Sequence, residues 1–185
     1  MTSILKVNEI QTTAGAVPTA ADLGLNVTGS VLQVVQDIET AAGSQSLALG
    51  VFSAAILSAS ITPISTSSKI LVLCNLHLST GTATAGAAAL LKRDGTAIGV
   101  GDASGSATQA TGGGLGAYIS SRLISNIAMT ILDSPSTTSA VTYTAHGKHG
   151  LNGTSVVYWN REQVAISSGG NSRVSSTLTL MEIAG

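Results

Sequence analysis

Residues 70–78 read Ile-Leu-Val-Leu-Cys-Asn-Leu-His-Leu, and this stretch decides the fold class. Every second residue is apolar, namely Ile70, Val72, Cys74, Leu76 and Leu78. The positions between them turn polar at Asn75 and His77. A period of two is typical of a β-strand with one buried face. The pattern therefore predicts a central strand in which Cys74, the single cysteine, is a buried small apolar residue.

Similar strand patterns recur along the chain. Residues 31–38 and 174–183 alternate in the same way, and residues 88–92 lead into Asp94-Gly95. Asp-Gly between two apolar runs predicts a hairpin, because both turn positions require positive φ. Asn152-Gly153 predicts a second hairpin, which would join a strand through residues 141–145 to one through residues 156–159.

Residues 118–132 are open to two interpretations. Ile119, Leu123, Ile127 and Ile131 have the spacing of one helix face, but alternation places the same residues and Met129 on one strand face. The β-branched content and the strand-ending Asp133-Ser134-Pro135 favour the strand.

Short strands, tight turns and little helix predict an all-β antiparallel sandwich of the jelly-roll kind. We expect this domain to span residues 31–185 and to follow an N-terminal arm and linker, residues 1–30. The arm opens with an alternating run that includes Ile4, Leu5, Val7 and Ile10. Lys6 and Glu9 interrupt the run, so it lacks the apolar core of a signal peptide, and we expect it to belong to the working protein.

The composition is poor in charge. Asp, Glu, Lys and Arg make up 9% of the residues, against about 25% in typical soluble domains, and the net charge is -1. This balance provides no basic field for nucleic acid. The apolar stretch 47–61 is interrupted by Gly and Ser and is too short to span a membrane, so we expect a soluble protein without membrane insertion.

The mean hydropathy is +0.41, which would leave a soluble monomer with much exposed apolar surface. Interfaces between subunits are depleted in charge. We therefore expect a homo-oligomer, specifically a homotrimer that buries charge-poor strand faces.

The sequence contains no strong catalytic motif, and we expect neither an enzyme nor a cofactor. Residues 112–116 are Gly-rich but lack the Lys-Ser/Thr of a phosphate loop, and they are interpreted as a surface loop. His146 and His149 could be a metal-ligand pair, but an exposed strand end is the favoured interpretation. Asp94, Asp102 and Asp133 are separated in sequence and each suits a turn, which argues against a paired-carboxylate hydrolase.

The remaining candidates concern surface contact. Tyr143, Tyr158 and Trp159 are interpreted as filling the core or a subunit seam, with stacking on a glycan as the alternative. The loops 99–116 and 167–173 are rich in Gly, Ser and Thr, and we expect them at an exposed end of the domain. The candidate recognition residues in these loops, which would contact a host-surface glycan, are Asp102, Ser104, Thr108, Gln109, Asn171 and Arg173.

Five sequence blocks resemble a family of tailed-phage virion proteins that is common among cyanophages. The blocks are LKVNEIQTTAG at 5–15, TGSVLQVVQ at 28–36, ITPISTSSKILVL at 61–73, LDSPSTTSAVTY at 132–143 and STLTLMEIA at 176–184. The resemblance extends along the chain from end to end. Residues 47–59 and 99–116 depart from the family pattern.

The resemblance implies a structural part of a phage particle, usually described in this family as a tail fibre. It implies that the arm attaches to other virion proteins while the C-terminal domain projects. A capsid decoration or head-fibre protein that stabilises the shell is the alternative.

Overall fold

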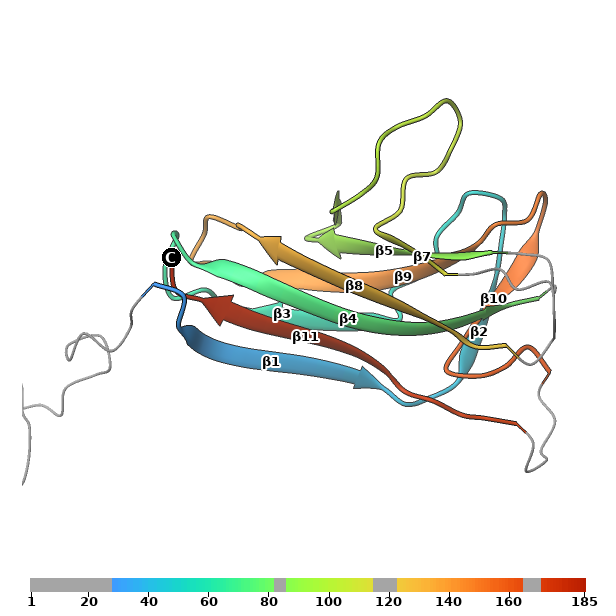
Figure 1. Cartoon of the computed structure of the whole chain (residues 1–185), viewed down its shortest axis with the longest axis horizontal. Helices are drawn as coiled ribbons and strands as arrows, with labels where there is room; N and C mark the ends of the chain where they lie inside the picture. The colour runs from blue at the N-terminus through green and yellow to red at the C-terminus, as the bar shows by residue number, and fades with distance from the viewer. Residues whose placement is uncertain (1–27, 82–85, 115–122, 165–170) are drawn as a thin grey trace, which may run out of the picture.

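The computed structural model describes residues 28–81, 86–114, 123–164 and 171–185. These residues form two antiparallel β-sheets packed face to face, which confirms the predicted all-β class (Figure 1). None of the described residues belongs to a helix long and apolar enough to cross a membrane. The strands are β1 (Val31–Glu39), β2 (Gly43–Leu47), β3 (Leu57–Ile61), β4 (Lys69–Thr80), β5 (Ala87–Arg93), β6 (Thr96–Ile98), β7 (Gly112–Gly114), β8 (Ser125–Asp133), β9 (Val141–His149), β10 (Ser155–Trp159) and β11 (Ser176–Ile183).

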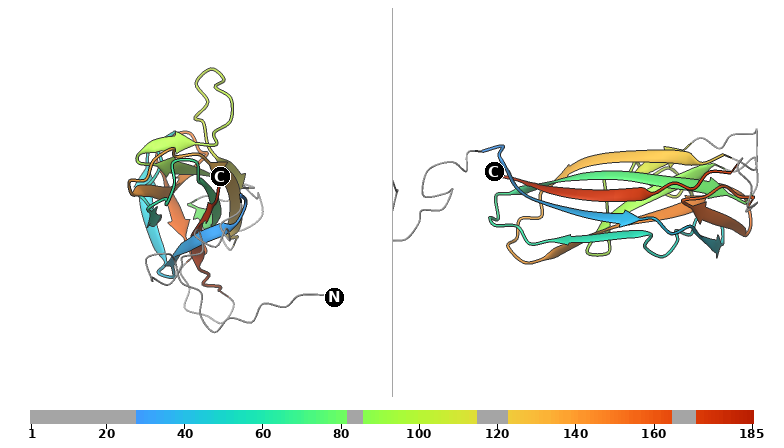
Figure 2. Two further views of the ribbon diagram at one scale, coloured as in Figure 1. Left: turned by 90° about the vertical axis from the view of Figure 1, so that its left-hand side faces the viewer. Right: turned by 90° about the horizontal axis from the view of Figure 1, so that it is seen from below.

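The two sheets differ in strand order. The six-stranded sheet runs β1-β11-β4-β10-β2, with β8 paired to β4, and the five-stranded sheet runs β3-β9-β5-β6, with β7 paired to β5. An end-on view shows the strands surrounding a common interior (Figure 2). The chain crosses between the sheets several times, so sequence neighbours such as β3 and β4 lie in opposite layers.

Strand β4 is central, as its sequence predicts. It pairs with β11 through residues 69–75, with β10 through residues 78–80 and with β8 through residues 70–78. All five of its alternating apolar residues are at most 2% exposed. Cys74 is among them, and burial raises the pKa of its thiol to about 12.

The other strand predictions are largely confirmed. β1 and β11 cover the two alternating runs, and β8 shows that the ambiguous segment is a strand from residue 125 onward. Ile127 and Met129 are buried, Leu123 precedes the strand, and Ile119 lies outside the described residues.

The two predicted hairpins differ in outcome. Asp94 and Gly95 have φ values of 47° and 83° and join β5 to β6 as a type I′ hairpin. Asn152-Gly153 does not form a hairpin, because β9 lies in the five-stranded sheet and β10 in the six-stranded sheet. Only Gly153 of this pair has positive φ, whereas a type I′ turn requires it at both positions. The segment instead carries the chain from one sheet to the other.

The interpretation of residues 112–116 as a loop is wrong for the first three. Gly112, Gly113 and Gly114 form β7, which pairs with residues 87–89 of β5. A Cβ on Gly112 would lie 2.8 Å from a side-chain carbon of Ile127. The missing side chain is therefore what lets β7 close over β8.

Both ends of the sandwich domain meet at one end of the molecule. The N–H of Gly29 donates to the carbonyl of Ala184, and the N–H of Ala184 donates to the carbonyl of Ser30, both at 2.8 Å. The chain therefore enters β1 beside the place where it leaves β11 (Figure 1).

Candidate functional site

The outward side of β1, β11, β4 and β8 is the most distinctive surface of the sandwich, and we call it the uncharged face. The strand register arranges its side chains in three rows across four strands. The rows are Val34-Met181-Leu71-Leu132, Gln36-Thr179-Leu73-Thr130 and Ile38-Thr177-Asn75-Ala128.

The first row is apolar from edge to edge. Val34 and Leu132 at its ends are 54% and 53% exposed, and Met181 and Leu71 between them are partly exposed. Ile38 in the third row is 51% exposed. Scattered exposed apolar residues are ordinary, whereas a continuous row over four strands has the character of an interaction surface.

Charge is nearly absent from the outward positions of these four described strands. Lys69, at the end near the termini, is the one exception. Asp37 lies on the inward side of β1 and accepts from the N–H of Ser58 at 2.8 Å. On the face itself, the Gln36 amide donates to the Thr179 hydroxyl at 2.7 Å. The polar groups here are thus uncharged and bond to one another.

The outward side of the five-stranded sheet, which we call the polar face, has the opposite character. Its positions include Ser58, Ser60, Thr142 and Thr144, and Lys92 pairs with Thr144 across strands. The hydroxyls of Ser60 and Thr142 lie 2.7 Å apart. This is the Ser, Thr and Lys surface expected of a sheet that faces water.

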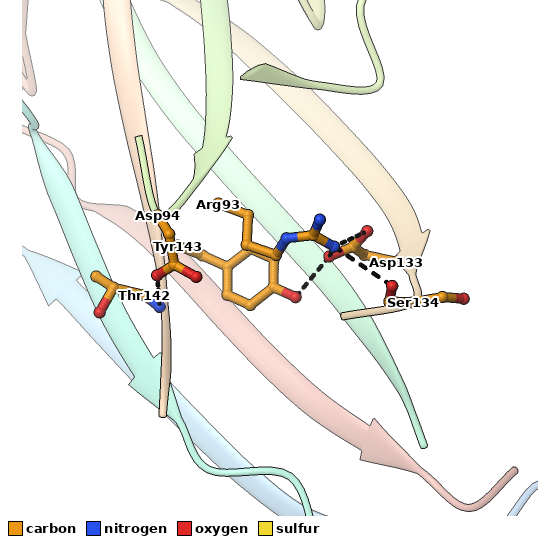
Figure 3. A network of polar contacts seen from close by, with 6 residues as sticks. All are labelled: Arg93, Asp94, Asp133, Ser134, Thr142 and Tyr143. Atoms are coloured by element: carbon orange, nitrogen blue, oxygen red, sulfur yellow. Dashed lines mark hydrogen bonds and ion pairs between the residues drawn. The ribbon is translucent and has the colours of Figure 1, made fainter. Parts of the chain in front are cut away.

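A polar network ties the two sheets together at the β5–β8 edge (Figure 3). Arg93 Nη1 donates to both carboxylate oxygens of Asp133, at 2.9 and 2.8 Å, and the Tyr143 hydroxyl donates to Asp133 Oδ2 at 2.7 Å. Burial, together with the hydrogen bond to Asp133, raises the pKa of Tyr143. Asp133 ends β8, as predicted. The prediction that its side chain serves a turn is wrong, because its carboxylate joins β8 to Arg93 on β5 and Tyr143 on β9.

Glu182 is a second internal carboxylate, and sequence reasoning missed it. It is fully buried, accepts a hydrogen bond from the Gln33 amide and accepts another from the N–H of Ile64 at 2.7 Å. Burial by itself raises the pKa of Glu182, but these hydrogen bonds outweigh it and the pKa is lowered overall. The alternation of β11 places Glu182 on the buried side of the strand, and this position could have predicted a buried carboxylate.

The histidine prediction needs correction. His146 and His149 are 8% and 1% exposed, so they are not an exposed strand end. His146 Nδ1 lies 2.9 Å from the Ser53 carbonyl and His149 Nε2 lies 2.8 Å from the Leu47 carbonyl. Burial lowers the pKa of His146. In the described part of the chain, no three His, Cys, Asp or Glu residues gather as a metal site would require.

The aromatic residues lie mainly inside. Tyr143 is fully buried and Trp159 packs against the core, which confirms the core interpretation for both. Tyr158 is partly exposed, and the Arg161 guanidinium lies 4.6 Å from its ring centre. The three side chains therefore do not form a stacking platform for a glycan.

The structure does not bring the candidate recognition residues together. Asp102, Ser104, Thr108 and Gln109 are exposed on the 99–111 loop, which rises from the side of the sandwich and not from an end (Figures 1 and 2). Asn171 and Arg173 precede β11, at the end opposite the termini; Arg173 is exposed and Asn171 only partly so.

The candidate attachment residues Ile4, Leu5, Val7 and Ile10 lie outside the described residues. Comparisons with known proteins add no family to this geometry. No protein-family model matches the chain, and no curated protein matches it significantly.

Proposed function

We propose that this chain is a structural, non-enzymatic subunit of a bacteriophage particle and that it assembles as a homotrimer through the uncharged face. The observation that carries the proposal is the apolar row Val34-Met181-Leu71-Leu132 within a surface almost free of charge. The assignment to a phage particle is based on the sequence blocks that resemble cyanophage virion proteins.

A second copy of the chain is the partner that fits this face best. A partner with charged groups would bury them without counter-charges, which costs several kcal/mol for each ion. Another copy presents the same apolar row and the same self-bonded amides and hydroxyls. Three copies around a threefold axis turn their uncharged faces towards that axis, so that each face meets both neighbours and no open end remains for further growth.

The strand order supports a jelly-roll description of each subunit. The six-stranded layer β1-β11-β4-β10-β2, with β8 on β4, faces the five-stranded layer β3-β9-β5-β6, with β7 on β5. Two packed antiparallel layers with repeated crossings between them are a feature of jelly rolls, whose basic plan has eight strands.

The position of the termini supports attachment by the N-terminal arm. Gly29 and Ala184 hydrogen-bond at one end of the sandwich, so in a ring of three the arms would leave from the same side. That arrangement suits a fibre-type appendage held by residues 1–30, with its opposite end directed towards the host.

A capsid decoration or head-fibre protein is the second candidate. The separation of the 99–111 loop from residues 171–173 favours it, because no single recognition surface combines the two predicted loops. A decoration protein uses the same homotrimer and needs no receptor.

Two measurements test the proposal. Light scattering on the purified full chain should give three times the 18.3 kDa chain mass, and a stable monomer would contradict the assembly. Cryo-electron microscopy of purified phage should then locate the protein on the tail or on the capsid. Absence from mature particles would contradict the virion assignment.

A further inference from the structure

An open pocket of about 370 Å³ lies at the end of the six-stranded sheet opposite the termini. Its volume falls in the range of small-molecule sites, about 300–1,000 Å³. The polar side chains that line it belong to His77, Asn126, Glu162 and Ser172. Leu123, Ile124 and Val174 supply apolar walls.

Two shielded polar atoms of this lining have no hydrogen-bond partner within the described part of the chain. Glu162 is 6% exposed, and its Oε1 accepts from the N–H of Ser172 at 3.0 Å, but its Oε2 has no partner. His77 Nδ1 is likewise without a partner. A buried acceptor that lacks a donor costs about 1–3 kcal/mol, so such atoms mark a place where a water molecule or a ligand completes the bonding.

The two atoms restrict the chemistry of that ligand. A carboxylate can only accept, whereas His77 Nδ1 accepts or donates according to its tautomer. A hydroxyl group both donates and accepts, so neighbouring hydroxyls satisfy Glu162 and His77 in either tautomer. An ammonium group only donates, so it satisfies Glu162 but not the tautomer of His77 in which Nδ1 is the donor. A metal ion finds no third acidic, His or Cys ligand among the described residues.

We infer that this pocket binds one uncharged sugar residue, with one hydroxyl bonded to Glu162 Oε2 and another to His77 Nδ1. Asn126 is exposed at the open side and supplies a further amide donor and acceptor. Leu123, Ile124 and Val174 pack against the C–H groups of the sugar ring, in place of the aromatic residues that the fold uses in its core.

This site goes beyond the proposed function and does not depend on it. His77 and Asn126 form the next row on the outward side of β4 and β8, so a homotrimer that uses the uncharged face has to leave this end of the face open. All of its lining residues come from one chain, and purified protein suffices to detect binding. A failure of the virion assignment would leave the sugar site untouched. A failure of the sugar site would equally leave the homotrimer standing.

The test is a titration of the full-length protein with methyl glycosides of glucose, galactose, mannose and N-acetylglucosamine, followed by NMR. At least one glycoside should bind with a Kd near 1 mM, about 4 kcal/mol, and shift the amide signal of Ser172. Glu162→Gln should weaken that binding at least tenfold. The matched control Asp102→Asn, on the 99–111 loop, should leave it unchanged.

A second variant keeps the test decisive if Glu162→Gln fails to fold. Val174→Trp fills the pocket and keeps both polar atoms, and it should abolish binding in a protein that still melts cooperatively. The inference is overturned if none of the four glycosides binds at millimolar concentration, or if both variants bind normally. Binding of methylammonium or Zn²⁺ in preference to the glycosides would overturn it in favour of a cation site.

Discussion

The uncharged face and the polar face are the two outer surfaces of one sandwich, yet they differ in the side chains that they present. Both use alternating strands with one buried side. The polar face presents Ser, Thr and Lys to the solvent, whereas the uncharged face presents Val34, Leu71, Met181 and Leu132.

This difference shows where the low charge content matters. A deficit of charge spread evenly over the molecule would only reduce its solubility. Here the outward positions of four strands carry one charged residue, Lys69. Charged residues on three of those strands, Asp37, Asp133 and Glu182, lie on the inward side. This distribution is the one expected if the proposed homotrimer covers one face and leaves the other in contact with solvent.

The largest expected effect comes from charging the uncharged face. Leu71→Glu should turn the proposed homotrimer into monomers, because three buried and unpaired carboxylates would face the interface between subunits. A cost of about 3 kcal/mol per charge raises the dissociation constant more than a hundredfold. Light scattering across a dilution series measures the change.

The matched control is Thr144→Glu on the polar face, which should assemble normally. If Thr144→Glu dissociates the protein and Leu71→Glu does not, the two faces have been assigned the wrong way round.

The next effect concerns the tie that holds the two layers together. Asp133→Asn should lower the free energy of unfolding by about 3 kcal/mol, because it leaves the partly buried Arg93 without its counter-charge. Tyr143→Phe removes one hydrogen bond and should cost about 1 kcal/mol. Urea denaturation measures both. An Asp133→Asn loss no larger than that of Tyr143→Phe would show that the ion pair contributes little.

Acid should weaken the end of the sandwich near the termini through Glu182. Because the folded-state pKa lies below the unfolded value, ionised Glu182 stabilises the fold above the unfolded pKa, about 4.5. That contribution is lost as the pH falls through the folded pKa.

Glu182→Gln should lower the free energy of unfolding by about 2 kcal/mol at neutral pH and flatten its decline in acid. Denaturation curves from neutral pH to about pH 3 test this. An unchanged pH profile in the variant would rule out Glu182 as a source of the acid sensitivity.

The smallest effect on stability is expected at the 99–111 loop. Hydrogen bonds given by residues 102–109 stay within the loop, as between Gln109 and Gly101 at 2.6 Å and between Ala107 and Ser104 at 2.9 Å. Replacing residues 102–109 by a short Gly-Ser linker should therefore shift Tm by less than a few degrees.

The same loop variant tests host contact. Lower adsorption of the phage to host cells would support a receptor-binding fibre, and normal adsorption with full incorporation would support the decoration alternative. A large fall in Tm would instead show that the loop packs in the subunit seam.

Much of the strand pattern could be predicted from local sequence. The alternation of β4, β1 and β11 and the Asp94-Gly95 turn each depend on residues close together in the chain. β2 was not predicted, because residues 43–47 contain a single large apolar residue, Leu47. β3 was missed within the apolar stretch 47–61, although Leu57, Ala59 and Ile61 alternate with two serines. β7 was missed because a run of glycines has no strand propensity, and only the close approach of Ile127 explains it.

The sequence by itself determined the all-β class, the buried side of β4 and the unusual shortage of charge, because periodicity and composition are local properties of the chain. Only the tertiary structure decided that Asn152-Gly153 crosses between sheets, that His146 and His149 are buried, and that Arg93, Asp133 and Tyr143 meet. It also decided that four strands from distant segments combine their outward residues into one uncharged face. Such outcomes depend on which strands become neighbours, and long-range pairing leaves no mark on any single stretch of sequence.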